Sequence, residues 1–287
     1  MLSKSLPEGV TLRNRIKYLI RRSNKMFVLA AIYGAMNVLS FVSLRNIGAG
    51  IFTIIAQCKI LTTATFSAIL LGRTYSWARW RALFGLSLGV LLFSQPIWSD
   101  VEKRKVQEGG SAFLGTCAVL IEVTLSGFAS IYFERVIKSD TEQLGIWERN
   151  FQLALASCPV YFLFIAYEGG GEAGFWGGWS AVSWSLAILG AAGGLLVALS
   201  IKYGDAILKT LATTGAIVLS SFFDHWFLGG PLNAIMMIAG VNVVISICNY
   251  TFDTTPVVEV NARSSGKSGE KFDLEKSDQE SNPLITK

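Results

Sequence analysis

The chain is poor in charged residues. Only 16% of its 287 residues are charged, 52% are hydrophobic and the mean hydropathy is +0.47, whereas an ordinary soluble domain carries about 25% charged residues. A soluble core of this length would lack the polar surface needed to cover itself. The charges cluster before Met26, after Thr251 and in short loops between long apolar runs. This layout is typical of a polytopic membrane protein, and it argues against a soluble enzyme and against nucleic acid as a partner.

Residues suited to disulfide or metal chemistry are scarce. Cysteine occurs only at Cys58, Cys117, Cys158 and Cys248, all inside apolar runs and at unrelated spacings. This excludes a disulfide framework and a C-x-x-C metal site. His225 is the sole histidine, so a His-based metal cluster is not expected either. The sequence also lacks the G-x-x-x-x-G-K-[ST] loop of ATP-driven proteins. It therefore predicts no metal, no cofactor and no enzymatic activity.

Eight stretches are long and apolar enough to cross a bilayer as helices, because a hydrocarbon core of about 30 Å needs about 20 mainly apolar residues. The predicted spans are Met26–Leu44, Ile47–Leu71, Trp80–Trp98, Ala112–Val136, Asn150–Tyr167, Ser180–Ile201, Asp205–Leu228 and Pro231–Thr251. The sequence therefore predicts an all-α, polytopic transmembrane helix bundle.

Lysine and arginine are unequally divided between the two sides of these spans. With a cytosolic N-terminus, nineteen of the 25 lie on the cytosolic side and four on the other. The positive-inside rule therefore places both termini in the cytosol. Residues 1–25 are expected to form a basic cytosolic segment and residues 26–251 the transmembrane domain. Residues 252–287, rich in Ser, Gly, Lys and Glu, are expected to be a disordered cytosolic tail.

A short motif occurs twice, 150 residues apart. Lys59–Thr63 and Lys209–Thr213 both read K-x-L-x-T. Each copy places a lysine within a span, where insertion scales assign it a cost of about 2.5–3.5 kcal/mol. Many transporters are built from repeats that hold the substrate between them near the bilayer midplane. Two interpretations stay open: the lysines reach the lipid headgroups by snorkelling, or both ammonium groups face a water-filled cavity and bind an anion such as phosphate.

Other polar residues also lie within the spans, where an unpaired polar atom is unfavourable. The amides of Asn37 and Gln57 have more donors and acceptors than one helix contact satisfies. The hydroxyls of Thr63 and Thr213 can instead bond to their own backbone. Glu122 is expected to be protonated or paired with a lysine, and proton coupling is an alternative role for it.

Pairs of glycines one helical turn apart favour close helix packing. Gly85-x-x-x-Gly89 is interpreted in this way. Gly190-x-x-x-Gly194 permits the same interpretation, but Gly193 and Gly194 also permit another, in which a surface without side chains opens onto a cavity beside Lys209.

Four ordered motifs resemble signatures of the nucleotide-sugar transporters. They are found within Gln57–Thr63, Leu125–Glu134, Arg149–Leu153 and Gly193–Lys209. The similarity extends from about Tyr33 to Tyr250, and it is greatest to the carriers of UDP-galactose, UDP-N-acetylglucosamine and CMP-sialic acid.

This resemblance implies a fold and an activity. The family fold is a drug/metabolite-transporter bundle of ten helices in two inverted repeats of five. The chain begins where the third family helix would begin, so its first repeat, residues 26–98, is expected to be incomplete and its second, residues 112–251, complete. The implied activity is antiport, in which a cytosolic pyrimidine nucleotide sugar, UDP- or CMP-linked, is exchanged for a lumenal nucleoside monophosphate.

The resemblance also suggests the binding residues. It places Lys59 and Lys209 on the family's phosphate-contacting lysines. It further suggests that the site is lined by Tyr33, Asn37, Gln57, Thr63, Asn150 and Thr213.

Alternatives remain for activity, partners and location. Glu122 could serve a proton-coupled carrier of another organic anion. The chain could instead be a non-transporting membrane protein that binds a carrier or a glycosyltransferase, and a homodimer is also possible. The implied location is the Golgi membrane or the endoplasmic reticulum. Glu280–Ile285 resembles an acidic dileucine signal, which would direct the chain to an endosomal or vacuolar membrane.

Overall fold

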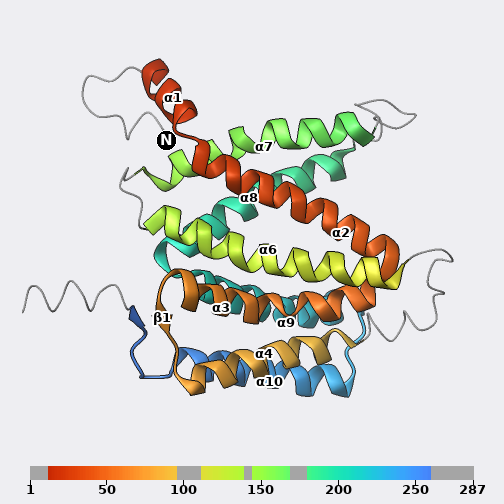
Figure 1. Cartoon of the computed structure of the whole chain (residues 1–287). Coiled ribbons are helices and arrows are strands. Elements are labelled where there is room, and N and C mark those ends of the chain that lie inside the picture. The colour runs from red at the N-terminus through yellow and green to blue at the C-terminus, as the bar shows by residue number, and fades with distance from the viewer. Residues whose placement is uncertain (1–11, 96–110, 139–143, 169–179, 260–287) are drawn as a thin grey trace, which may run out of the picture.

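The computed structural model describes residues 12–95, 111–138, 144–168 and 180–259. Within these ranges it contains nine helices and one pair of very short strands. The helices are α1 (Leu12–Arg21), α2 (Asn24–Ala56), α3 (Lys59–Leu70), α4 (Trp77–Phe93), α6 (Ala112–Lys138), α7 (Ile146–Glu168), α8 (Ala181–Tyr203), α9 (Ala206–Leu228) and α10 (Ala234–Thr251). The strands are β1 (Arg73–Thr74) and β2 (Val258–Glu259). The helices from α2 onward run roughly along one common axis (Figure 1).

The first two predicted spans are joined by a turn at Gly48. This residue has φ 72° and ψ 161°, which interrupts the helical backbone of α2. Glycine adopts such a conformation without the steric penalty that a Cβ would bring. The chain reverses direction toward the end of α2 (Figure 1), and residues 49–56 lead across Gln57 and Cys58 into α3. The predicted break between Leu44 and Ile47 thus lies slightly too early.

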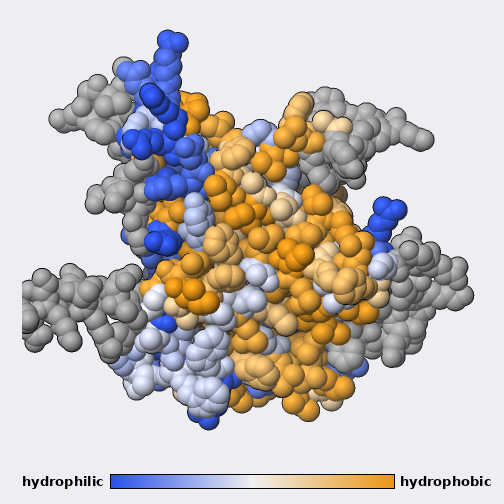
Figure 2. Space-filling model, in the orientation of Figure 1, coloured by the Kyte–Doolittle hydropathy of each residue, from blue (hydrophilic) through white to orange (hydrophobic). Residues whose placement is uncertain are grey.

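The helices form an apolar bundle suited to a membrane. Each predicted span overlaps a helix, and α2, α6, α8, α9 and α10 are long and apolar enough to cross a bilayer. By length and composition, the described residues thus support five crossings, and eight remain a prediction. Figure 2 shows hydrophobic side chains over most of the middle of the visible face and hydrophilic ones toward α1. The chain is therefore a helical, polytopic membrane protein.

Two larger groups of buried side chains, and a smaller one around Ile47 and Val119, hold the bundle together. One joins α3, α4, α9 and α10, with Leu83, Leu86 and Val243 at most 1% exposed. The other joins α2, α6 and α8 around residues such as Leu29 and Ala129. Gly89 permits the close approach of α4 to α10, because a Cβ there would lie 2.9 Å from a methyl group of Val243. The packing interpretation of the Gly85 and Gly89 pair is thereby confirmed.

The tail begins with ordered residues, contrary to the expectation of disorder from residue 252 onward. Strand β2 pairs antiparallel with β1, with Glu259 opposite Arg73. The carboxylate of Asp253 accepts hydrogen bonds from the hydroxyls of Ser76 and Thr255. We call residues 252–259 the C-terminal strap. The backbone pairing and the Asp253 bonds fix it on the loop between α3 and α4. The later tail, with Glu280–Ile285, lies outside the described residues.

Candidate functional site

A small cavity of about 100 Å³ lies between α3, α6 and α9, three helices from distant parts of the sequence. Its lining is rich in hydroxyl groups. The lining residues are Gln57, Lys59, Ile60, Thr63, Ser126, Ser130, Lys209, Thr210, Thr213, Thr214 and Ile217. Lys59 and Thr213 are exposed and Lys209 is half-buried, so the cavity is open on the side of Lys59.

Both lysines of the repeated motif line this cavity, and no carboxylate does. In the described part of the chain, no acidic side chain forms an ion pair with Lys59 or Lys209 within 4.0 Å. The two ammonium groups are also near enough to repel each other. Uncompensated charge at membrane depth is unfavourable, so the cavity is suited to an anion with more than one negative charge.

The two copies of the motif have the same local hydrogen bond. The Oγ1 of Thr63 donates to the carbonyl oxygen of Lys59 at 2.7 Å, and the Oγ1 of Thr213 donates to that of Lys209 at 2.8 Å. This bond satisfies each hydroxyl proton within its own helix. The oxygen atoms keep their acceptor lone pairs, and the hydroxyl groups stay one turn from each ammonium group.

Different neighbours fix the two lysines. Helix α3 packs closely on α6, because a Cβ at Gly127 would lie 2.9 Å from the backbone carbon of Thr62. The Oγ1 of Thr62 also donates to the carbonyl oxygen of Val123 at 3.2 Å. Helix α9 instead begins at the N-cap residue Asp205, whose Oδ1 accepts from the amide of Leu208 at 2.6 Å. Lys209 lies directly after this capped turn.

Glu122 does not line the cavity, although it lies one helical turn before the lining residue Ser126. It is near enough to Lys59 to interact with it electrostatically. Among the described ion pairs, none joins Glu122 to a lysine within 4.0 Å. The expected direct pairing is therefore not present in this structure.

The other predicted site residues lie elsewhere. Tyr33 packs with the buried cluster of α2, α6 and α8. The amide of Asn37 donates to the hydroxyl of Tyr161 at 2.7 Å, beside a separate, mainly apolar cavity of about 660 Å³. The amide of Asn150 donates to its own helix, at the carbonyl oxygen of Ile146. The structure thus brings together only Gln57, Thr63, Thr213 and the two lysines.

Gly193 and Gly194 do not open onto the cavity beside Lys209. Both are exposed, and a Cβ at either position would meet no atom within 4 Å. Helix α8 is little covered by other helices, since only 11% of the residues in its most apolar stretch are buried.

Sequence reasoning did not assign several lining residues to the site. These are Ile60, Ser126, Ser130, Thr210, Thr214 and Ile217. Helical spacing could have found some of them, because residues three, four and seven positions apart share one helix face. Thr210, Thr213, Thr214 and Ile217 follow this spacing, and so do Ser126 and Ser130. The choice of face depends on how α6 and α9 pack, which a single helix does not reveal.

Comparison with known proteins identifies the family. Residues 8–251 match the family described as nucleotide-sugar transporter. The chain is 35% identical over 237 residues to a UDP-N-acetylglucosamine transporter of Rattus norvegicus, covering 81% of this chain and 72% of that protein. It is 36% identical over 234 residues to a UDP-N-acetylglucosamine/UDP-N-acetylgalactosamine transporter of Caenorhabditis elegans, covering 78% and 67%. It is 31% identical over 244 residues to a UDP-galactose translocator of Mus musculus, covering 84% and 62%. The chain therefore belongs to the nucleotide-sugar transporter family, whose members are transporters rather than enzymes.

Proposed function

We propose that the chain exchanges a cytosolic pyrimidine nucleotide sugar for a lumenal nucleoside monophosphate. The observation that carries the proposal is the convergence of Lys59 and Lys209 on one cavity that no carboxylate lines. Relatives named for UDP-linked sugars favour a UDP-linked substrate, and a CMP-linked substrate is the second choice. The two ammonium groups would neutralise the phosphates, since ammonium–phosphate hydrogen bonds are charge-assisted.

The same charges support exchange rather than one-way transport. An empty cavity would keep two uncompensated ammonium groups at membrane depth while the helices move. A bound phosphate group removes this penalty. Both a nucleotide sugar and a nucleoside monophosphate carry phosphate, so either could accompany the movement in its own direction. Such movement would rock one repeat against the other around the site.

The cavity fits only part of such a substrate. Sites for drug-sized ligands enclose about 300–1,000 Å³, whereas this cavity has about 100 Å³. We assign it to the phosphate groups, with Gln57, Thr63 and Thr213 as further hydrogen-bonding groups. The base and the sugar would then occupy space that opens when the helices move. Tyr33, Asn37, Asn150, Gly193 and Gly194 are candidates to line that space.

A proton-coupled carrier of another organic anion is the second candidate. Its support is the position of Glu122 near Lys59. In that case a pH gradient would drive uptake, and Glu122→Gln would abolish this dependence. Uptake that does not depend on the pH gradient in either the native chain or Glu122→Gln would exclude this candidate.

The Golgi membrane is the proposed location, with the endoplasmic reticulum as the alternative that the family resemblance also implies. Homodimerisation and association with glycosyltransferases belong to the same proposal. Microscopy of the tagged full chain, with and without Leu284→Ala and Ile285→Ala, would distinguish the Golgi from an endosomal or vacuolar address.

Binding can be tested on the purified full chain by thermal melting with UMP, CMP, GMP and AMP. A ligand at 100 times its dissociation constant stabilises a protein by about 2.7 kcal/mol. We expect UMP or CMP to raise the melting temperature of the native chain and of the control Lys202→Ala, whose lysine lies at the end of α8. Lys59→Ala and Lys209→Ala should each abolish the shift. Exchange would then be measured in vesicles preloaded with the stabilising monophosphate.

A cooperative melt that no nucleotide shifts would contradict the proposal. A non-transporting membrane protein that binds a partner would then become the better description.

A further inference from the structure

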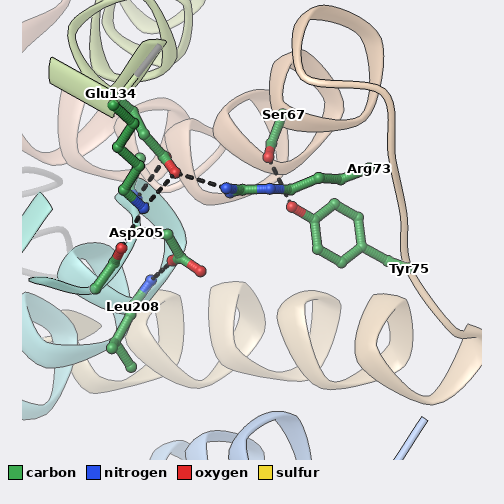
Figure 3. A network of polar contacts seen from close by, with 9 residues as sticks. Ser67, Arg73, Tyr75, Glu134, Asp205 and Leu208 are labelled. Atoms are coloured by element: carbon green, nitrogen blue, oxygen red, sulfur yellow. Dashed lines mark hydrogen bonds and ion pairs between the residues drawn. The ribbon is translucent and has the colours of Figure 1, made fainter. Parts of the chain in front are cut away.

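A buried carboxylate ties together three parts of the bundle at the end where α6 finishes and α9 begins (Figure 3). The side chain of Glu134, on α6, has no exposed surface. Its Oε1 lies 2.9 Å from Nη2 of Arg73 and 3.0 Å from Nζ of Lys138. Its Oε2 accepts from the backbone amide of Ala206, the first residue of α9, at 2.9 Å. Lys138 also donates to the carbonyl oxygen of Gly204. One carboxylate thus joins the loop after α3, the end of α6 and the start of α9.

This network lies directly beyond the cavity. On α6, Glu134 follows the lining residue Ser130 by four positions, which is about 6 Å along a helix. On α9, Ala206 precedes the lining residue Thr210 by the same number of positions. The charges of Arg73 and Lys138 belong to the side that the positive-inside rule assigns to the cytosol. The network therefore lies one helical turn beyond the cavity, at the end that this rule makes cytosolic, whereas the exposed Lys59 lies toward the other end.

The third helix around the cavity is held at the same end. Ser67 lies one turn after Thr63 on α3, is fully buried, and shares a hydrogen bond of 2.6 Å with the hydroxyl of Tyr75. Burial raises the pKa of the Tyr75 phenol, so this group keeps its proton at neutral pH. Figure 3 shows Tyr75 and Arg73 side by side, both reaching from the loop toward the bundle.

The C-terminal strap supports this loop from outside. Strand β2 pairs with β1 at Arg73, and the guanidinium of Arg79 donates to the carbonyl oxygen of Asp253 at 3.0 Å. Arg73 is thus held by its backbone on the strap and by its side chain on Glu134.

We propose that Glu134 is a cytosolic latch, a positioning residue that must release Arg73 and the start of α9 before an anion from the cytosol can reach Lys59 and Lys209. This inference rests on the proposed transport function. A buried ion pair that loses one partner leaves an unpaired buried charge, which is strongly unfavourable. The network is therefore stable when fully formed or when fully opened to water, as an alternating-access carrier requires.

Thiol labelling from each side of the membrane tests the latch. The reporter is Ser130→Cys in a chain whose four native cysteines are replaced by alanine, probed with a membrane-impermeant thiol reagent in sealed vesicles of known orientation. We expect Glu134→Gln, and independently Arg73→Gln, to raise the cytosolic labelling rate at least tenfold. The lumenal labelling rate should stay the same or fall, because alternating access opens one side at a time.

The matched control is Glu148→Gln. Glu148 is likewise buried and paired, with its Oε1 2.8 Å from Nε of Arg15, but it lies outside the cavity. It should leave both labelling rates unchanged. Equal cytosolic rates in the parent and in either latch variant that melts cooperatively would overturn the proposal. So would a rise on both sides, or the same rise in Glu148→Gln, because either result would indicate general loosening.

The labelling assay needs no substrate, so it separates the latch from the transport proposal. Failure of UMP and CMP to stabilise the parent chain would count against the proposed substrate. If the parent chain binds UMP or CMP but the latch variants are labelled at the parent's rate, the result would count against the latch alone.

Discussion

Helices α3 and α9 carry the same motif but are held in place by different kinds of contact. Steric contact fixes α3, because Thr62 lies against Gly127 of α6 with no room for a methyl group. Polar contacts fix the start of α9, where Asp205 caps the helix and Glu134 accepts from Ala206. Close packing resists sliding in every direction, whereas a cap or an ion pair can break and re-form as a unit. The comparison indicates that α3 and α6 stay together while the start of α9 is the more readily released side.

The largest expected effect on stability comes from disturbing the close contact between α3 and α6. In Gly127→Ala, the new methyl group would lie 2.7 Å from Oγ1 and 2.9 Å from the backbone carbon of Thr62. Overpacking of this kind costs about 1–3 kcal/mol, which exceeds the helix-propensity gain of up to about 1 kcal/mol for replacing glycine by alanine. We expect a lower thermal midpoint for the purified chain.

Gly215→Ala is the control on α9. Its methyl group would lie 3.4 Å from Cδ1 of Ile247, at the edge of ordinary contact, so the midpoint should stay the same or rise. A Gly127→Ala chain at least as stable as the native one would show that this contact does not fix α3.

A smaller loss of stability should follow from removing the N-cap at the start of α9. Asp205→Ala deletes the acceptor for the amide of Leu208, and loss of an N-cap costs about 0.5–2 kcal/mol. Because Lys209 lies directly after this capped turn, the affinity for the stabilising nucleotide should also fall. Thermal melts with and without UMP measure both quantities.

Cys58→Ala is the matched substitution on α3, where the residue at the N-cap position makes no capping bond through its side chain. It should change the free energy of unfolding by less than about 0.5 kcal/mol. Similar losses of stability in Asp205→Ala and Cys58→Ala would show that the starts of α9 and α3 do not differ in this way.

The smallest effect concerns the C-terminal strap, which holds the loop between α3 and α4. Hydrogen bonds from Ser76 and Thr255 lower the pKa of Asp253 from 3.8 to about 2. A lowered pKa means that the charged form favours the folded strap at pH values above 3.8, and that this contribution is lost as the pH falls toward 2. Cleavage of the strap by a broad protease should therefore be constant between about pH 5 and pH 8.

Asp253→Asn should be cleaved faster than the native chain across that whole range. A rate that changes with pH in the native chain but not in Asp253→Asn would contradict this account.

The fold was largely predictable because apolar length is a local property. Each predicted span overlaps a helix, and the family resemblance is confirmed by the match over residues 8–251. Two details were not predictable. The helical backbone is interrupted at Gly48 rather than between Leu44 and Ile47, because a left-handed backbone angle does not follow from hydropathy. The start of the tail is ordered, because β2 finds its partner at β1, far away in the sequence.

The sequence alone determined the membrane character, the unequal division of positive charge between the two sides of the spans and the two lysines of the repeated motif. These depend on composition and on short-range spacing. Tertiary structure decided which polar residues meet. It brought Gln57, Thr63 and Thr213 to the lysines and left Asn37 and Asn150 in other contacts. It also joined Glu134 on α6 to Arg73 and to the first residue of α9. The rotation and pairing of helices set these meetings, and both depend on side chains of several helices at once.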